Sequence, residues 1–188
     1  MGNILLFAPQ RFSDSRGWFS ETYNALREID AGITATFVQD NQSYSASAKT
    51  IRGIHFQSPP HAQAKLVRCL RGRLIDYAID LRNGSPTYGK YVSAELSHDN
   101  GYQLYIPAGF GHAFITLEEA TEISYKVSDY YSPAFDCGIR WDCPDIAIDW
   151  PHKGSAVLSE KDAALPRLAD FRSPFEFDGR PMELVMLT

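Results

Sequence analysis

The chain has 188 residues, of which 44% are hydrophobic and 13% aromatic, and its formal net charge is −5. That length suits one domain, 1–188, whose core is large enough to hold without disulfide bonds or a structural metal. An acidic chain without a basic block has no general attraction for nucleic acid or for an anionic membrane, so an anionic ligand would need a local cluster of Arg and Lys.

The first element in chain order is a short apolar run, residues 3–8. It lacks a basic flank and is too short for a signal peptide or a membrane-spanning helix, so we expect no membrane partner and a cytoplasmic location. The run predicts an isolated β-strand that needs a sheet to join.

A helix is predicted next, over residues 21–29, with Gly32 as its C-terminal stop. Beyond it, Gly and Pro recur at short intervals and separate segments rich in β-forming residues. These segments cover residues 37–43, 65–70, 74–81, 88–96, 103–106 and 123–127, with a turn at residues 71–73. After about Ser132 the chain is Pro-rich and polar, with a short helix near residues 161–165. Such regular turn signals predict an all-β sandwich or barrel.

Polar and charged side chains recur within these β-rich segments. They are Gln39, Asn41, Arg52, His55, Gln57 and Lys65. Such a face lies either in solvent or in the mouth of a barrel, where small barrels hold a ligand. Periodicity alone does not separate these two interpretations.

The cysteines predict free thiols. Cys69, Cys137 and Cys143 are odd in number, have no CxxC spacing, and have no His or Cys at zinc-ligand spacing beside them. We therefore expect a reducing compartment and no zinc site.

Short motifs follow one another from about residue 9 to residue 166. They are Phe12-x-Asp14-x-Arg16-Gly17-x-Phe19-x-Glu21, Phe37-Val38-Gln39-Asp40-Asn41, Arg52-Gly53-Ile54-His55-Phe56-Gln57, Lys65-Leu66-Val67-Arg68, Asp76-x-Ala78-x-Asp80-Leu81-Arg82, Ser85-Pro86-Thr87-Tyr88-Gly89, Ile106-Pro107-Ala108-Gly109-Phe110 with His112, Tyr125-Lys126, Tyr130-Tyr131-Ser132-Pro133 and Ser159-x-Lys161-Asp162. In this order they resemble the dTDP-4-dehydrorhamnose 3,5-epimerase family of the cupin superfamily.

The resemblance implies a fold and an assembly. The implied fold is all-β, a cupin-type jelly-roll β-barrel with a few short peripheral helices. The implied assembly is a homodimer that uses neither cofactor nor metal. In the family the N-terminal strand pairs with the partner subunit, so nucleotide contacts are expected to cross the interface.

The implied reaction is epimerisation at C3 and C5 of dTDP-4-dehydro-6-deoxy-D-glucose to dTDP-4-dehydro-L-rhamnose, in deoxysugar and polysaccharide biosynthesis. The C4 ketone acidifies the hydrogens on C3 and C5, so catalysis needs a base, a group that holds the enolate charge and an acid on the opposite face. By resemblance His55 is the base and Asp162 orients it. Lys65 is the cation beside the C4 oxygen, and Tyr125 is the acid.

Binding residues are also implied by the resemblance. Those that match nucleotide- or diphosphate-holding positions are Arg16, Glu21, Gln39, Asn41, Arg52 and Lys161. Tyr131 matches an aromatic that stacks on the base, and His112 matches a sugar-contacting histidine. Two positions depart from the family: Asp136 stands where Glu is frequent at the nucleotide, and Ala113 stands where Gly is usual and is expected to narrow the room beside the sugar.

Three other functions remain open from the sequence. A metal-dependent cupin would fit the segment that ends in His112, but Gln57 stands where that signature needs a second histidine, and His61 lies in an expected loop. A non-catalytic sugar-nucleotide binder would be expected to lose the acid or base, and all of these residues are present. A 3-epimerase or ketoisomerase on a related keto sugar would share fold and site.

Overall fold

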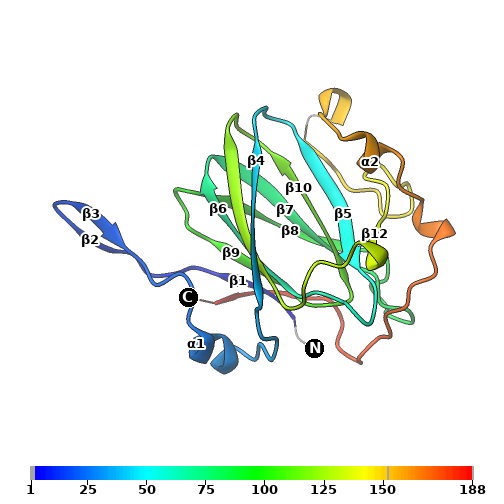
Figure 1. The fold of residues 1–188 in the computed structure, drawn as a ribbon, viewed down its shortest axis with the longest axis horizontal. Helices are drawn as coiled ribbons and strands as arrows, with labels where there is room; N and C mark the ends of the chain where they lie inside the picture. The colour runs from blue at the N-terminus through cyan, green and yellow to red at the C-terminus, as the bar shows by residue number, and fades with distance from the viewer. Residues whose placement is uncertain (1–2, 152, 188) are drawn as a thin grey trace.

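The computed structural model describes residues 3–151 and 153–187, and β-strands dominate this part of the chain (Figure 1). The strands are β1 (Ile4–Phe7), β2 (Phe12–Asp14), β3 (Gly17–Phe19), β4 (Gln39–Ser45), β5 (Ile51–Gln57), β6 (Lys65–Arg71), β7 (Arg73–Asp80), β8 (Tyr91–Ser97), β9 (Gln103–Ile106), β10 (Phe110–Thr116), β11 (Thr121–Val127), β12 (Asp136–Gly138) and β13 (Leu184–Leu187). The helices are α1 (Ala25–Asp30) and α2 (Glu160–Ala163), with 3-10 turns η1 (Pro133–Phe135), η2 (Lys153–Ser155) and η3 (Leu168–Asp170).

Two sheets form the body of the fold. Among the described residues, one sheet has six strands in the order β13-β1-β9-β6-β11-β4, and the other has five in the order β12-β5-β10-β7-β8. Neighbours in each sheet are mostly distant in sequence, as in a jelly roll. The predicted all-β jelly-roll fold with short peripheral helices is therefore confirmed.

The core lies on both faces of the five-stranded sheet. Leu74 and Ala78 of β7 face the six-stranded sheet and pack in one apolar cluster with its residues. Tyr77 and Ile79 point to the other side, where they pack against Trp150 and its neighbours in the C-terminal part of the chain. This alternation is the period-2 geometry of a strand, and it gives the five-stranded sheet a second covering layer.

Capping residues set the ends of the two helices. The expected helix at 21–29 is shorter at its start, because the Asn24 side chain accepts a hydrogen bond from the Leu26 amide at 3.0 Å and caps α1 there. Gly32 has φ +85° and donates to the Ile29 carbonyl, so its role as the stop is confirmed. The second helix starts after its cap, Ser159.

The N-terminal strand finds its sheet within its own chain. β1 pairs in antiparallel fashion with β9 and in parallel fashion with β13. Both of its edges are thus occupied, and the expectation that it pairs with a partner subunit is wrong for this chain. The strand that fills the second edge, β13, was not predicted from the sequence.

The hairpin of β2 and β3 extends away from the two sheets (Figure 1). Its aromatic side chains are unusually open: Phe12 is 54% exposed, Trp18 47% and Phe19 70%. Large apolar groups gathered on a projecting element are typical of a protein–protein contact.

Within the described ranges, no helix is long and apolar enough to cross a membrane. Cys69, Cys137 and Cys143 are free, which confirms that prediction, and Cys69 and Cys143 are buried.

Gly53 is expected to be indispensable to the packing of β5. Its φ is +125°, and a Cβ there would lie 2.5 Å from the Ala113 Cβ. We expect Gly53→Ala to lower the free energy of unfolding by about 3 kcal/mol, because strained backbone and overpacking add. Gly84→Ala is the control: φ is +78° but no heavy atom lies within 4 Å, so about 1 kcal/mol should be lost. Equal losses in urea unfolding would show that the contact with Ala113 is unimportant.

Candidate active site

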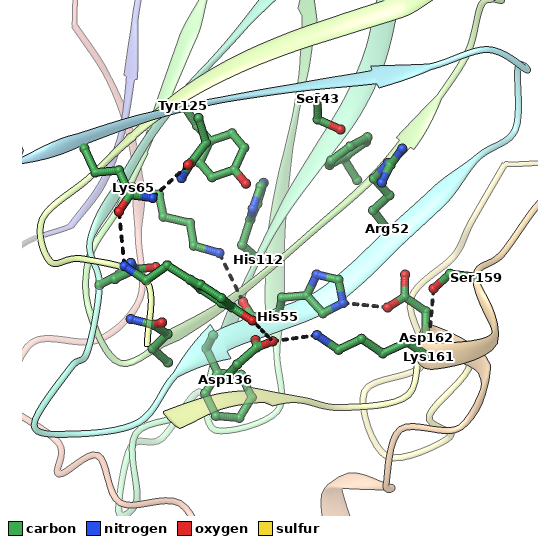
Figure 2. Close-up of a pocket in the computed structure, with 17 residues that line it drawn as sticks. Ser43, Arg52, His55, Lys65, His112, Tyr125, Asp136, Ser159, Lys161 and Asp162 are labelled. Atoms are coloured by element: carbon green, nitrogen blue, oxygen red, sulfur yellow. Dashed lines mark hydrogen bonds and ion pairs between the residues drawn. The ribbon is translucent and has the colours of Figure 1, made fainter. Parts of the chain in front are cut away.

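A cavity of about 460 Å³ opens between the two sheets (Figure 2). Its lining comes from strands of both sheets, from α2 with the residue that caps it, and from the connections that follow β5 and β11. The lining residues are Gln39, Asn41, Ser43, Arg52, His55, Phe56, Gln57, Gln63, Lys65, His112, Phe114, Tyr125, Tyr131, Asp136, Ser159, Lys161 and Asp162. The polar face seen in the sequence therefore lines a cavity.

The structure brings together most of the predicted site residues, including His55, Lys65, Tyr125 and Asp162. Two predicted binding residues lie elsewhere. Arg16 sits at the turn of the projecting hairpin, with its side chain 88% exposed and ion-paired to Asp14 at 2.6 Å. Glu21 follows that hairpin and lies 3.2 Å from Arg27.

A bulge in β5 aims Arg52 and His55 into the same space. Residues three apart in a regular strand point to opposite faces. Here His55 pairs with His112 and Arg52 pairs with Phe114, so β5 carries one extra residue between them. The Arg52 guanidinium then reaches the facing sheet, where it donates to the Tyr44 carbonyl at 3.0 Å.

His55 forms a close pair with Asp162. Its Nε2 lies 2.6 Å from Asp162 Oδ1, and the Asp162 side chain is only 4% exposed. Burial acts to raise the pKa of Asp162, but hydrogen bonds from His55, the Gly53 backbone and Ser159 together hold that pKa below its ordinary value. The carboxylate is ionised at neutral pH and fixes the imidazole, whose other nitrogen is left for the cavity (Figure 2).

Lys65 places a buried cation beside this pair. Its Nζ donates to the His55 carbonyl at 3.3 Å. Burial lowers the pKa of Lys65 to about 8, although the carboxylates of Asp76 and Asp136 act in the opposite direction. At neutral pH the Lys65 amine is therefore still mostly protonated, and its positive charge can stabilise a developing oxyanion.

A second, fully buried pair holds His112. Its Nε2 lies 2.6 Å from Asp76 Oδ1, with side chains 7% and 0% exposed. Burial lowers the pKa of His112 despite the neighbouring carboxylate, so the ring is neutral and can accept a hydrogen bond from a ligand. Sequence reasoning missed Asp76 as part of the site. A charged residue within the apolar strand 74–81 was the available signal.

Tyr125 faces His55 from the opposite sheet. It lies on β11, its ring centroid is 6.5 Å from that of His112, and it packs against the core as well as lining the cavity. Burial raises the pKa of the Tyr125 phenol. The hydroxyl thus keeps its proton at neutral pH and can act as a proton donor.

The mouth of the cavity is organised by Asp136. Tyr131 donates its hydroxyl to Asp136 Oδ2 at 3.1 Å, and Lys161 Nζ lies 2.6 Å from the same oxygen. The hydrogen bond to Asp136 raises the pKa of Lys161, which stays a cation. Asp136 is one methylene shorter than the Glu that is frequent at this position in the family, and it still contacts both Tyr131 and Lys161.

Ala113 does not narrow the cavity, contrary to expectation. It is fully buried and packs in the apolar cluster on the far side of β10 from His112. Because side chains alternate along a strand, the residue after His112 must point away from it. Phe114, two residues on, returns to the cavity and was not predicted.

The amide of Gln57 is engaged with the backbone, donating to the carbonyls of His61 and Tyr130 at 2.8 and 3.2 Å. The His61 ring lies 3.1 Å from Asp129. Within residues 3–151 and 153–187, no group of three or more His, Cys, Asp or Glu side chains could hold a metal ion.

The arrangement suits proton transfer at carbon. A base with an ionised partner, a protonated phenol on the opposite sheet and a buried ammonium surround one cavity. Together they could remove a proton next to a carbonyl group, hold the resulting oxyanion and return a proton from the other side.

Known proteins resemble this chain over most of its length. The sequence model of the dTDP-4-dehydrorhamnose 3,5-epimerase family matches residues 1–170. A protein of that name from Sinorhizobium fredii is 50% identical over 181 residues, covering 94% of this chain and 91% of its own. The crystal structure of such an enzyme from Bacillus anthracis, with TDP and PPi bound, has a TM-score of 0.82 at 47% identity and covers 85% and 90% of the two chains. A 3,5-epimerase from Legionella pneumophila, in complex with dTDP-4-keto-L-rhamnose, has a TM-score of 0.82 at 43% identity and 86% coverage of each chain.

The buried ammonium of Lys65 is expected to reduce stability at neutral pH. At a pH below the folded-state pKa of about 8, Lys65 is charged in the folded protein, and the full cost of burying that charge lowers the free energy of unfolding. Between this pKa and the ordinary value of 10.5, Lys65 holds its proton in the unfolded chain but loses it in the folded protein. The cost therefore disappears as the pH rises through this range. Lys65→Met should therefore gain up to about 3 kcal/mol of stability at pH 7, several degrees in Tm, and little near pH 10.5. Lys90→Met, at an exposed lysine, should change Tm little at either pH. A Lys65→Met variant that is less stable at pH 7 would contradict this.

Proposed function

The chain belongs to the dTDP-4-dehydrorhamnose 3,5-epimerase family, and on that premise we propose how its residues carry out the reaction. It epimerises C3 and C5 of dTDP-4-dehydro-6-deoxy-D-glucose to give dTDP-4-dehydro-L-rhamnose, in the biosynthesis of rhamnose. The observation that carries the proposal is the His55–Asp162 pair, set across one cavity from Tyr125 and beside Lys65.

His55 is the base. Its cavity-facing nitrogen takes the proton from the sugar carbon, and the C–H electron pair moves into the C4 carbonyl to form an enolate. Asp162, ionised and 2.6 Å away, stabilises the imidazolium that results. Lys65 holds the enolate oxygen, since a fixed buried cation acts most strongly where charge develops.

Tyr125 is the acid. Its pKa is raised, so it carries a proton to give, and it approaches from the sheet opposite His55. Protonation of the enolate carbon by Tyr125 inverts the centre. The phenolate then regains a proton from solvent, and His55 releases its own. The ketone itself supplies the acidity of the two sugar positions, so these groups suffice for the chemistry.

The mouth of the cavity holds the nucleotide. Arg52 and Lys161 supply positive charge for the diphosphate, and Arg can donate two parallel hydrogen bonds to one phosphate. Tyr131 stacks on the base, while Gln39, Asn41 and Asp136 contact the nucleoside. His112, neutral and held by Asp76, accepts a hydrogen bond from a sugar hydroxyl.

The active form is a cytoplasmic homodimer in which each hairpin serves the partner's cavity. Arg16 and Glu21 lie outside the cavity of their own chain, on or next to an element with exposed Phe12, Trp18 and Phe19. A second copy would cover those side chains and receive the two charged groups. The free cysteines fit the reducing conditions of the cytoplasm.

The acid and base roles separate in heavy water. With dTDP-4-keto-6-deoxyglucose, His55→Ala should lose deuterium incorporation at both C3 and C5, because one base serves both carbons. Tyr125→Phe should keep some exchange while product formation falls by about 10²- to 10⁴-fold. NMR follows both quantities, and Tyr102→Phe, outside the cavity lining, is the control. Residual exchange at one carbon in His55→Ala would reveal a second base, and full product formation by Tyr125→Phe would exclude it as the acid.

The crossed assembly can be tested by mixing two inactive or weakened chains. Light scattering should give twice the 21.1 kDa chain mass. Arg16→Ala alone should raise KM, and His55→Ala alone should be inactive. Mixed dimers of the two should regain wild-type kcat/KM in half of their sites, because one cavity then has both His55 and the partner's intact arginine. If Arg16 served its own chain, no mixed dimer would contain a complete site, and mixing would restore nothing.

A further inference from the structure

The loop that carries Tyr131 lies between β11 and η1, and packing does not fix it. Tyr130 and Tyr131 have 64% and 56% of their surface exposed. The loop residues 129–132 belong to no strand or helix. Something other than buried apolar contact must therefore hold this backbone where it stands.

Gln57 holds two residues of the loop, the one before Tyr131 and the one after it. Its Nε2 donates to the Tyr130 carbonyl at 3.2 Å and to the His61 carbonyl at 2.8 Å, and its Oε1 accepts from the Ser132 amide at 2.7 Å. Gln57 is itself only 4% exposed. The nitrogen and the oxygen of the side-chain amide are both hydrogen-bonded, and they bind the backbone on either side of Tyr131.

Two further glutamines bind the neighbouring groups. Gln39 Oε1 accepts from the Tyr131 amide at 3.1 Å, and Gln63 Nε2 donates to the Asp129 carbonyl at 2.7 Å. Gln39 comes from β4 of one sheet and Gln57 from β5 of the other, while Gln63 comes from the connection between β5 and β6. Each residue from 129 to 132 therefore has one backbone group bound by a glutamine.

We infer that Gln57 is a positioning residue that, with Gln39 and Gln63, holds the loop so that the Tyr131 ring is in place before the nucleotide arrives. The inference rests on the proposed function, in which Tyr131 stacks on the base. An aromatic ring already in its bound position loses less entropy on binding. The amide is suited to this because it supplies a donor and an acceptor at once.

Removing the amide should loosen the loop and weaken nucleotide binding without slowing chemistry. Gln57→Met keeps the length and volume of the side chain but leaves the Ser132 amide and the Tyr130 carbonyl unpartnered. We expect Kd for dTDP, measured by calorimetry, and KM to rise together by about 5- to 20-fold, within the range that base stacking contributes. The maximal rate, kcat, should stay within about twofold, because the Tyr131 contact is equal in ground and transition states.

Thr116→Val is the matched control. Thr116 is also buried and uses its side-chain oxygen twice, accepting from the Thr50 amide and donating to the Ser47 carbonyl, both at 3.0 Å, but at the end of β10 and outside the cavity lining. It should lower Tm as Gln57→Met does and leave Kd for dTDP unchanged. A similar rise of Kd in both variants would mean that general destabilisation, and not the loop, accounts for the effect.

A double variant tests whether Gln57 acts through Tyr131. Tyr131→Ala removes the ring, so adding Gln57→Met should weaken dTDP binding no further. Gln57→Glu is the second single variant, which keeps an acceptor for the Ser132 amide and loses the donors, and its Kd should lie between those of wild type and Gln57→Met. Fully additive losses, or an unchanged Kd in Gln57→Met, would overturn the inference.

Backbone amide exchange without nucleotide separates this inference from the proposed function. The Tyr131 and Ser132 amides, followed by NMR, should exchange faster in Gln57→Met than in wild type, and amides of the β8–β9 turn should not. Unchanged exchange would refute the positioning role directly. Wild-type protein that neither binds dTDP nor epimerises the keto sugar would instead refute the proposed function, whatever the amides do.

Discussion

The 2.6 Å contact between His55 and Asp162 is the interaction on which the arrangement of the cavity depends. It joins a strand of the five-stranded sheet to a helix from the C-terminal part of the chain, so only tertiary structure creates it. The contact depends on three features of the fold: the bulge in β5, the cap that Ser159 gives to α2, and the packing of the C-terminal layer over the five-stranded sheet. The layer thus stabilises the sheet and delivers a carboxylate to the cavity edge, where hydrogen bonds keep it ionised despite burial.

Around that contact, opposite charges balance within a small space. Lys65 faces Asp76 and Asp136, and Lys161 binds Asp136. Buried charges reduce stability unless they are paired, and a cavity built for an anion needs cations that are not fully neutralised. The protein resolves this by burying its ammonium with carboxylates nearby but not in direct contact, so that the charge remains available to an oxyanion. Such sites commonly cost stability in exchange for activity.

The sequence supported much of the fold because apolar and polar residues alternate in strands such as 123–127 and because turn residues separate the β-rich segments. It did not predict β10 as a strand, since both of its faces are buried and the period-2 signal is lost. The proposed catalytic residues were predicted from motifs, whereas Ala113 and Arg16 show what motifs omit. A motif gives neither the direction in which a side chain faces, as at Ala113, nor its distance from the cavity of its own chain, as at Arg16. The roles of Gln57 and Asp76 depend on backbone and side-chain partners far away in sequence, and only the assembled fold reveals such partners.

The parallel pair of β1 and β13 has a consequence for how the protein is made. Ile4 pairs with Leu184, so one edge of the first strand stays unpaired until more than 180 residues have left the ribosome. Throughout that interval an apolar strand is without its neighbour and open to pairing with other nascent chains. The jelly roll has many such distant pairings, which makes folding slow. A chaperone that binds the N-terminal segment would therefore cover a strand that still has an unpaired edge. The six-stranded sheet is complete only when β13 pairs with β1.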